Sequence, residues 1–300
     1  MGSLFGGYLF NNGEDAVLYD INREHVDAVN TQGLIIEEPA LGKEITVKIP
    51  ATCNKEDLKN SDFTILFVKS TATEAVAGDY FPFAKESTVV VTLQNGYGNE
   101  EIIRNRFGAG RTAAGVTSQG ATFLGPGRIR HAGTGPTYLS MSDNSNEKLE
   151  PFITALTMAG FEIHITDNME SLVWSKLIIN IGINALTAVT GLKNGQLLEY
   201  PDTKSIMEEL VNEALLVVEA KGIQLQYDDP VKQVFTVAEK TGLNRSSMLQ
   251  DFDKKRVTEI DFINGAILKE AEKYNIPAPV NRTVTRLIRV LQEAMRKKDG

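Results

Sequence analysis

The sequence predicts an α/β domain built on a parallel sheet, followed by an all-helical domain. In the first half of the chain β-rich runs alternate with helical patterns, the order typical of a parallel sheet covered by helices. After Asn168 the strand signals stop, and apolar residues recur at helical spacing to the end. The length of 300 residues suits two such domains, which we place at residues 1–166 and 167–300.

The first domain is expected to open with a helix over residues 3–12 and a strand over 15–20. Residues 63–68 and 88–93 are continuous apolar or β-branched runs, as strands buried on both faces should be. Glycine and threonine are frequent after residue 110, which favours antiparallel strands with tight turns. The other expected elements are helices over 23–30, 72–80 and 100–107 and a closing strand over 161–166.

The second domain is expected to consist of helices alone, because no β-like run interrupts its helical periodicity. Its helices are predicted over residues 169–190, 203–221, 230–240, 256–274 and 280–296.

Composition and charge narrow the possible partners. The formal net charge of -8 argues against sequence-independent binding to nucleic acid or to an anionic membrane. Cys53 is the one cysteine, so no disulfide forms within the chain. One cysteine and three histidines are too few ligands for a histidine- or thiolate-rich metal site. We see no apolar run near the roughly 18 residues of a membrane span and no signal peptide. We therefore expect a cytoplasmic protein with a small-molecule partner and no metal.

Two features of the first domain are typical of dinucleotide binding. Gly2 and Gly6 lie near the start of the first helix, where backbone N–H groups can hold a pyrophosphate. Asp20 ends the next predicted strand, 18 residues after Gly2, where an acid accepts hydrogen bonds from the adenosine ribose. The alternative is that both glycines only allow close helix packing.

A polar stripe on the predicted helix 169–190 indicates a second site. Lys176, Asn180 and Asn184 follow one another at helical spacing on a helix that is otherwise almost entirely apolar. A buried ammonium and two buried amides need polar partners, which a substrate would provide. The alternative is a solvated stripe on a surface helix.

A carboxylate on a later predicted helix supplies a negative charge that is complementary to the Lys176 ammonium. On the predicted helix 256–274, Glu259 falls at the edge of the apolar face, although an acid paired at the rim explains it equally well. Ser246 and Ser247 precede this helix, and a plain N-cap is the simpler explanation of that pair.

Ordered motifs along nearly the whole chain resemble the ketopantoate (2-dehydropantoate) reductase family. The first of them resembles the end of a Gly-x-Gly-x-x-Gly-Ser loop, and the most specific combine Trp174-Ser175-Lys176-Leu177 with Asn180 and Asn184. The resembling segments are 1–6, 68–70, 93–96, 115–117, 125–127, 131–135, 174–177, 194–195, 246–251, 258–261, 264–265 and 277–281.

The resemblance implies a Rossmann-type dinucleotide-binding domain and a helical domain like the C-terminal part of 6-phosphogluconate dehydrogenase. It implies NAD(P)H-dependent reduction of 2-dehydropantoate to (R)-pantoate in pantothenate biosynthesis. Lys176 would protonate the ketone oxygen, and Glu259 would bind the substrate hydroxyl and fix the lysine. The remaining implied residues are Asn180, Asn184, Asn194 and Ser247 for the substrate and Lys69 and Asn95 for the nicotinamide and ribose side.

The sequence departs from this family in two ways. Asp20 stands where an acid disfavours a 2′-phosphate, although the family prefers NADPH, so we lean slightly towards NADH; Arg23 could still bind the phosphate. Family members also carry about ten residues before the position of Gly2, forming the central strand and two glycines of the loop. We therefore expect this sequence to be a shortened one.

Other functions stay open at this stage. An NADH-preferring D-2-hydroxyacid dehydrogenase of the mandelate type needs the same lysine, glutamate and asparagines. A nucleotide-sensing regulator without catalysis is disfavoured by the intact Lys176 and Glu259. A homodimer formed through the helical domain is compatible with the sequence.

Overall fold

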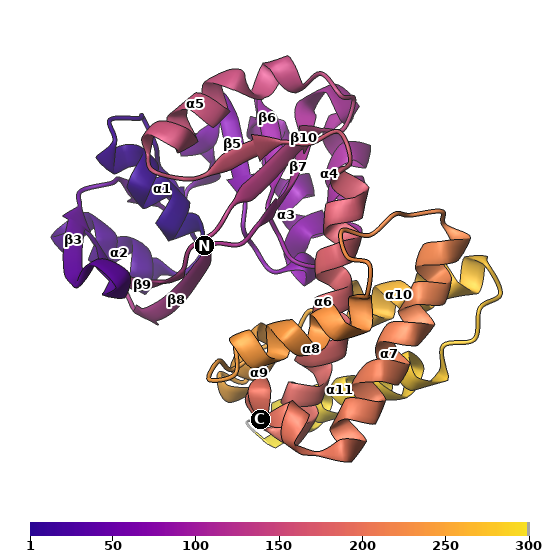
Figure 1. Ribbon diagram of the computed structural model, residues 1–300. Coiled ribbons are helices and arrows are strands. Elements are labelled where there is room, and N and C mark those ends of the chain that lie inside the picture. Colours follow the sequence, from indigo (N-terminus) through magenta and orange to yellow (C-terminus); the bar gives the residue numbers. More distant parts are fainter. Residues whose placement is uncertain (299–300) are drawn as a thin grey trace. The chain divides into compact units, whose positions relative to one another are not determined.

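The β-branched run Val89–Thr92 forms strand β6, which is buried along its whole length in the computed structural model. The structure describes residues 1–298 (Figure 1). β6 pairs in parallel with β5 (Phe63–Leu66) and β7 (Thr112–Thr117). β10 (Thr137–Met141) pairs antiparallel with β7 and parallel with β11 (Ile163–Ile165), giving the sheet order β11-β10-β7-β6-β5.

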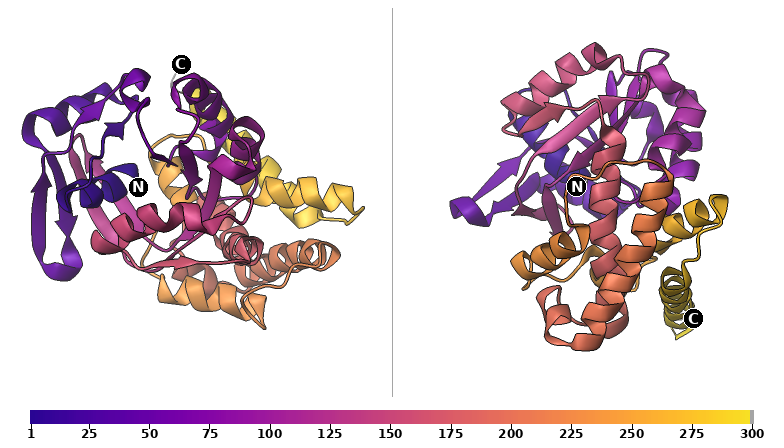
Figure 2. Two further views of the ribbon diagram at one scale, coloured as in Figure 1. Left: turned by 90° about the horizontal axis from the view of Figure 1, so that it is seen from above. Right: turned by 45° about the vertical axis from the view of Figure 1, so that its right-hand side comes forward.

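Alternate residues of β6 serve cores on opposite faces of this sheet. Val89 and Val91 pack with α1 (Gly2–Asn11) and α5 (Glu150–Met158), whereas Val90 packs with α3 (Thr73–Tyr80) and α4 (Asn99–Phe107). Helices therefore cover both faces, which explains why the predicted run is continuously apolar. Figure 2 shows the helices of this unit from two further sides.

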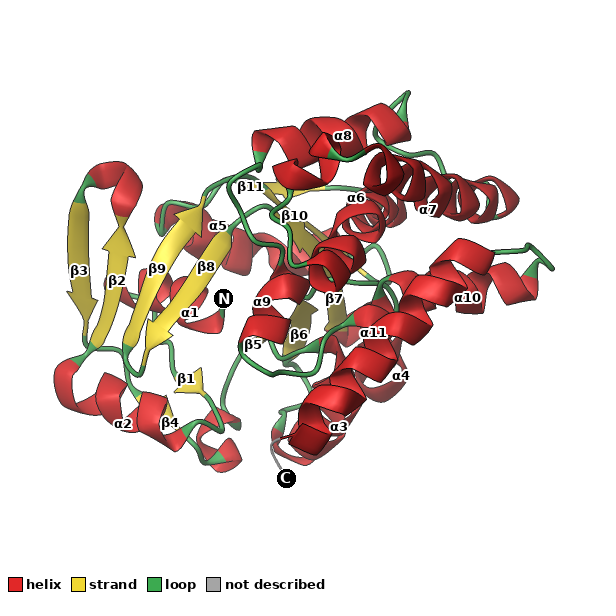
Figure 3. Ribbon diagram, turned by 90° about the horizontal axis from the view of Figure 1, so that it is seen from below, coloured by secondary structure: helices red, strands yellow, loops and turns green. Residues whose placement is uncertain are grey.

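A second sheet has the strand order β3-β2-β9-β8, as Figure 3 shows. β2 pairs antiparallel with β3 and parallel with β9, and β9 forms a hairpin with β8. The bounds are β2 Leu34–Glu38, β3 Lys43–Val47, β8 Gly120–Gly125 and β9 Arg128–Gly133, with α2 at Arg23–Gln32.

Helix α1 packs closely because two glycines remove side chains from its surface. A Cβ on Gly6 would lie 2.6 Å from Leu18 Cδ2, and one on Gly7 would lie 2.8 Å from Leu34 Cδ2. At Gly2 the nearest atom would be 3.9 Å away, in Phe67. The prediction that Gly2 and Gly6 both open the helix towards a ligand is therefore wrong for Gly6, which serves packing.

The strand expected over 15–20 is reduced to β1 (Leu18–Tyr19), which pairs only with β4 (Ala51–Thr52). Within residues 1–298, β1 and β5 are each the edge of a sheet and no strand joins them.

The chain divides into two compact units. The first comprises Met1–Gln94 and Asn99–Met169, and the second comprises Asn95–Gly98 and Glu170–Gly300. The expected boundary after residue 166 differs from the observed boundary after residue 169 by three residues. The structure also assigns the short segment 95–98 to the second unit, which the sequence did not predict. The helices of the second unit are α6 (Met169–Thr190), α7 (Pro201–Ala220), α8 (Pro230–Lys240), α9 (Ser247–Asp253), α10 (Asn264–Lys273) and α11 (Pro279–Lys298).

Helix α6 is the central helix of the second core. Trp174, Ile178 and Ile181 are fully buried in it. By length and composition α6 could also cross a membrane, which the sequence prediction did not foresee, but 67% of its apolar window is buried inside the structure. A core helix meets the same criterion, so this feature is weak evidence for a span.

The single helix expected over 256–274 is wrong. The chain forms a 3-10 turn, η8 (Ile260–Phe262), before α10, and the two are separated by Ile263 with φ -112° and ψ -95°. Thr258 Oγ1 accepts the Ile260 N–H at 3.3 Å, a local bond that competes with helix formation. Glu259 therefore lies in an irregular segment and not on a helix face.

Gly115 on β7 provides a test of this packing. A Cβ there would lie 2.6 Å from the Tyr138 carbonyl oxygen, and backbone cannot move aside as a side-chain tip can. We expect Gly115→Ala to lower the free energy of unfolding by about 1–3 kcal/mol in urea denaturation. Gly133→Ala is the matched control, because its Cβ would meet only atoms at 3.8 Å and beyond. Equal stability of the two variants would contradict this account.

Candidate active site

Lys176 is a partly buried ammonium on α6, a long helix that is mostly buried in the core of the second unit. Burial lowers the pKa of Lys176 to about 8, and the negative charge of Glu259 opposes that shift. A lysine in this state is mostly protonated at neutral pH yet releases its proton readily. This is the protonation behaviour that a general acid requires.

Glu259 is 6% exposed and lies immediately before η8. The Phe262 N–H donates to the Glu259 carbonyl oxygen at 2.9 Å, which fixes the backbone that carries the carboxylate. The prediction placed Glu259 near Lys176 by way of a helix that does not form. The electrostatic contact with Lys176 is nevertheless present, through a different local structure.

The two asparagines of the stripe lie on α6 as predicted, with Asn180 partly buried and Asn184 6% exposed. Asn184 Nδ2 donates to Ser247 Oγ at 3.5 Å, so the structure brings together two residues that were each predicted to bind substrate. Lys176, Asn184, Ser247 and Glu259 thus all belong to the second unit.

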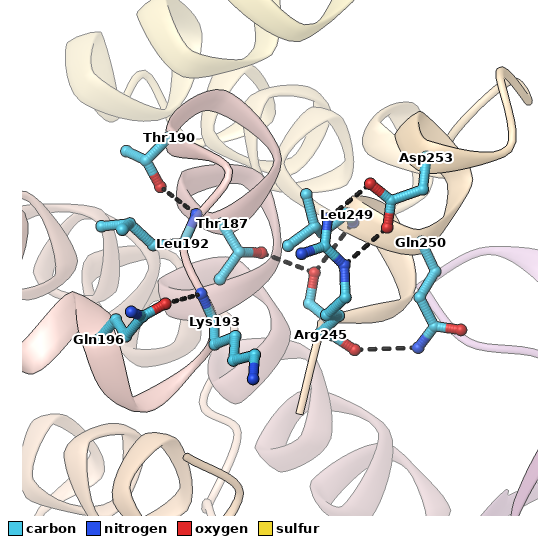
Figure 4. A network of polar contacts seen from close by, with 10 residues as sticks. Thr187, Thr190, Leu192, Lys193, Gln196, Arg245, Leu249, Gln250 and Asp253 are labelled. Carbon is cyan, nitrogen blue, oxygen red and sulfur yellow. Dashed lines mark hydrogen bonds and ion pairs between the residues drawn. The ribbon is translucent and has the colours of Figure 1, made fainter. Parts of the chain in front are cut away.

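Ser246 and Ser247 have separate roles at the start of α9. The Ser246 hydroxyl caps the helix by accepting the Leu249 N–H at 3.1 Å, and it lies 2.6 Å from Thr187 Oγ1. Figure 4 labels Thr187 and Leu249, the two residues that this hydroxyl contacts. Ser247 is exposed. The N-cap explanation therefore applies to Ser246, and the hydroxyl of Ser247 faces solvent beside Asn184.

Asn194 is held by structural contacts. Its Nδ2 donates to Thr241 Oγ1 at 2.9 Å and its N–H donates to the Asn244 carbonyl at 3.0 Å. Among the described residues, its buried Oδ1 has no hydrogen-bond partner. These bonds connect Asn194 to residues 241–244 and not to the α6 stripe.

The segment 95–98 is attached to η8, next to Glu259, by contacts that the sequence did not reveal. The Tyr97 N–H donates to the Phe262 carbonyl at 2.8 Å. Gly96 has φ +88°, and a Cβ there would lie 2.7 Å from the same carbonyl oxygen. The partly buried Asn95 is therefore carried beside the segment of Glu259. The glycine itself was the only signal in the sequence that a tight contact was needed here.

Aromatic packing completes this attachment. The Tyr97 ring lies 5.1 Å from that of Trp174 on α6, and the Lys221 ammonium lies 5.8 Å from the first ring and 5.7 Å from the second. Lys221 also pairs with Glu270 at 3.2 Å. Trp174 precedes Lys176 by half a helical turn, so the segment 95–98 packs on the helix that bears the lysine.

The first unit carries four of the five predicted cofactor residues, whereas the fifth, Asn95, belongs to the second unit. Gly2 begins α1, and no side chain of the described residues caps that helix end. Asp20 follows β1 and accepts the Asn22 N–H at 2.9 Å. Burial lowers the pKa of the Met1 amine, and the negative charge of Asp20 opposes that shift. An open helix N-terminus with a nearby acid fits the pyrophosphate and ribose of a dinucleotide.

The other two cofactor residues lie at helix starts in the same unit. Arg23 is the exposed first residue of α2, and Lys69 is partly buried at the N-cap of the short turn Ser70–Ala72. Within the described part of the chain, no group of His, Cys, Asp and Glu could hold a metal ion.

The chain is similar over nearly its full length to ketopantoate reductases. The family model described as ketopantoate reductase PanE/ApbA matches residues 1–144, and the model of its C-terminal part matches 168–292. The 2-dehydropantoate 2-reductase of Pyrococcus abyssi is 36% identical over 292 residues, which cover 96% of this chain and 94% of that protein. That of Halobacterium salinarum is 32% identical over 293 residues, or 97% and 96%.

Two solved structures share the fold over nearly the full length. A PanE/ApbA family ketopantoate reductase from Ralstonia eutropha superposes with a TM-score of 0.89 at 30% identity, covering 97% of this chain and 95% of that one. A D-mandelate dehydrogenase in a ternary structure with NADH and anilino(oxo)acetate also has a TM-score of 0.89, at 28% identity and 99% and 96% coverage.

The coupling of Lys176 to Glu259 can be measured. Glu259→Gln removes the one negative charge that raises the lysine pKa, so we expect that pKa to fall from about 8 by about one unit or more. The pH dependence of chemical labelling of Lys176, resolved by mass spectrometry, reports this value. Asp253→Asn, which alters an exposed pair with Arg245, should leave it unchanged. An unaltered lysine pKa in the Glu259 variant would contradict the coupling.

Proposed function

Because the chain belongs to the ketopantoate reductase PanE/ApbA family, we propose that it reduces 2-dehydropantoate to (R)-pantoate with a nicotinamide cofactor. The observation that carries this proposal is the Lys176 ammonium held beside the Glu259 carboxylate with a pKa of about 8. The Asn180 and Asn184 amides on the same helix supply the polar contacts that a hydroxylated keto acid needs.

The chemistry follows from the charges. A reduced nicotinamide, when bound, would supply the hydride that the carbonyl carbon of the substrate accepts. Lys176 stabilises the negative charge that develops on the oxygen and then donates a proton to it, so the ketone becomes an alcohol. The anionic substrate and Glu259 both favour the charged lysine, which keeps the acid protonated until the transfer.

The remaining polar groups orient the substrate. In this proposal Ser247 Oγ, which is exposed beside Asn184, donates to the substrate carboxylate, and the Asn184 and Asn180 amides donate to further substrate oxygens. Glu259 accepts a hydrogen bond from the substrate hydroxyl, and Asn95 lies beside the same segment. Asn194 acts indirectly in this proposal, because its hydrogen bonds hold the loop 241–244 before α9.

Removal of the acid gives the most direct test. Lys176→Met keeps the length and apolar stem but has no proton to donate, so we expect kcat to fall by a factor of about 10²–10⁴. The dissociation constant of the cofactor, from nicotinamide fluorescence, should stay within about threefold. Lys254→Met, at an exposed position, is the control. An unchanged melting temperature would show that the Lys176 variant folds. A near-normal kcat in that folded variant would refute the assignment.

The second candidate function is that of an NADH-dependent D-2-hydroxyacid dehydrogenase. It is favoured by the likeness to the D-mandelate dehydrogenase structure. Comparing kcat/KM for ketopantoate, phenylglyoxylate and 2-ketoisovalerate separates the two. Rapid turnover of phenylglyoxylate without turnover of ketopantoate would favour the second candidate over the first.

For the cofactor we propose a preference for NADH, supported by Asp20 at the end of β1. A carboxylate beside a 2′-phosphate is unfavourable. Asp20→Asn should therefore raise kcat/KM for NADPH relative to NADH about tenfold, which corresponds to about 1.4 kcal/mol of repulsion. Asp15→Asn, an exposed acid, is the control. A strong NADPH preference in the unaltered protein, lost in Arg23→Ala, would show that Arg23 decides instead.

We also propose that the protein acts in the cytoplasm as a homodimer formed through its helical unit. Exposed apolar side chains on α11 support this, with Val290 63% and Leu287 46% exposed. Light scattering during gel filtration measures the oligomeric state, and a monomer at micromolar concentration would contradict the proposal.

A further inference from the structure

Tyr97 is a partly buried residue that the proposed mechanism does not use, yet it contacts both elements that carry the acid and its counter-charge. Its backbone N–H donates to the Phe262 carbonyl oxygen at 2.8 Å, in the turn η8 that follows Glu259. Its ring lies 5.1 Å from that of Trp174, two residues before Lys176 on α6. One residue of the second unit therefore joins the backbone of the Glu259 segment to the helix of the lysine.

The backbone half of this connection leaves little room for movement. Gly96 has φ +88°, and a Cβ there would lie 2.7 Å from the Phe262 carbonyl oxygen and 2.8 Å from Phe262 Cβ. The Phe262 N–H in turn donates to the Glu259 carbonyl oxygen at 2.9 Å. A displacement of Tyr97 is therefore transmitted to the backbone that bears the Glu259 carboxylate through two hydrogen bonds and one close backbone contact.

The ring half of the connection is held by a positive charge. The Lys221 ammonium lies 5.8 Å from the centre of the Tyr97 ring and 5.7 Å from that of Trp174, within the range of cation–π attraction to both. The Lys221 side chain is 15% exposed and pairs with Glu270 at 3.2 Å. Although burial acts to lower it, the pKa of Lys221 is raised, chiefly by the hydrogen bond with Glu270, so this side chain stays charged at neutral pH. Lys221 therefore stabilises the contact between the two rings.

We propose that Tyr97 is a positioning residue for the Lys176–Glu259 pair: it sets the separation of the carboxylate from the ammonium, and Lys221 holds its ring in place. This inference rests on the proposed function, in which Lys176 is the proton donor, but its test requires no turnover. Burial and the charge of Glu259 account for the shifted pKa of Lys176 among the described residues, so neither Tyr97 nor Lys221 acts on it directly. The pKa of Lys176 therefore reports how far away the carboxylate is held.

The first variant is Tyr97→Leu, which removes the ring and keeps the backbone N–H. Without the ring contact the segment 95–98 is held less firmly and the carboxylate lies farther from the ammonium, so we expect the pKa of Lys176 to fall by about half a unit. The pH dependence of chemical labelling of Lys176 measures this value. The alkaline limb of kcat should move to lower pH by the same amount, because the reaction needs the protonated lysine. Tyr97→Phe keeps the ring and should retain the lysine pKa of the unaltered protein.

A double-mutant cycle with Glu259→Gln separates positioning from a general loosening of the structure. If Tyr97 acts through the carboxylate, Tyr97→Leu should leave the lysine pKa of the Glu259→Gln variant unchanged, because no charge remains to be displaced. A shift caused by altered hydration of Lys176, or by loosening of α6, would persist in that background.

Two lysines that share one partner provide a matched control for the role of Lys221. Lys221 and Lys273 both pair with Glu270, at 3.2 Å and 2.6 Å, but it is Lys221 that lies over the aromatic rings. We expect Lys221→Met to lower the pKa of the active-site lysine in the same direction as Tyr97→Leu and to add nothing in the Tyr97→Leu background. Lys273→Met should leave that pKa unchanged. Lys221→Met also tests the inference if the melting temperature shows that Tyr97→Leu does not fold.

The outcomes are distinct. A lower lysine pKa in the Tyr97→Leu and Lys221→Met variants, which disappears in the Glu259→Gln background, supports the inference. An unchanged lysine pKa in the folded variants, or a shift of equal size with and without the Glu259 carboxylate, would overturn it and leave the proposed function intact. A supporting pattern of lysine pKa values in a protein that turns over no keto acid would overturn the proposed function, while the positioning of the pair by Tyr97 would stand.

Discussion

The ammonium of Lys176 lies on a helix that is mostly buried in an apolar core, and a carboxylate of the second unit stabilises that charge. An unpaired buried charge costs several kcal/mol, so a lysine there requires a nearby carboxylate. Glu259 provides it, from a segment that is kept out of helical form by the Thr258 hydroxyl and is attached to residues 95–98 through Phe262. The resulting pKa of about 8 is a balance between desolvation and attraction.

The first unit meets a different constraint, which is that α1 must pack against two cores while its N-terminus stays open. Phe5 and Leu9 join the core of the five-stranded sheet, and Leu4 joins that of the four-stranded sheet. The glycines at positions 6 and 7 let the helix lie close to β1 and β2. Within residues 1–298 no side chain caps the start of α1. Asp20, which follows β1, and His25, on α2, lie near it.

The sequence predicted those elements whose pattern is long and local. Helix α6 has the predicted bounds, Met169–Thr190, and α8 likewise, because both have sustained periodicity and clear ends. Glu259 was identified correctly as an acid near Lys176 but on a helix that does not exist, since a helical wheel cannot register the competing bond of Thr258. The attachment of Tyr97 to Phe262 and Trp174 joins residues far apart in the chain, and local patterns contain no record of such contacts.

The Tyr97, Trp174 and Lys221 cluster also gives the protein an optical property. Trp174 is the only tryptophan of the chain, it is fully buried, and its indole N–H has no hydrogen-bond partner among residues 1–298. An indole shielded from water emits at shorter wavelength than an indole in solvent, and tryptophan can be excited at wavelengths that are too long for tyrosine to absorb. All of the tryptophan fluorescence therefore originates on the helix that carries Lys176, and it reports the integrity of the helical unit without a contribution from the first.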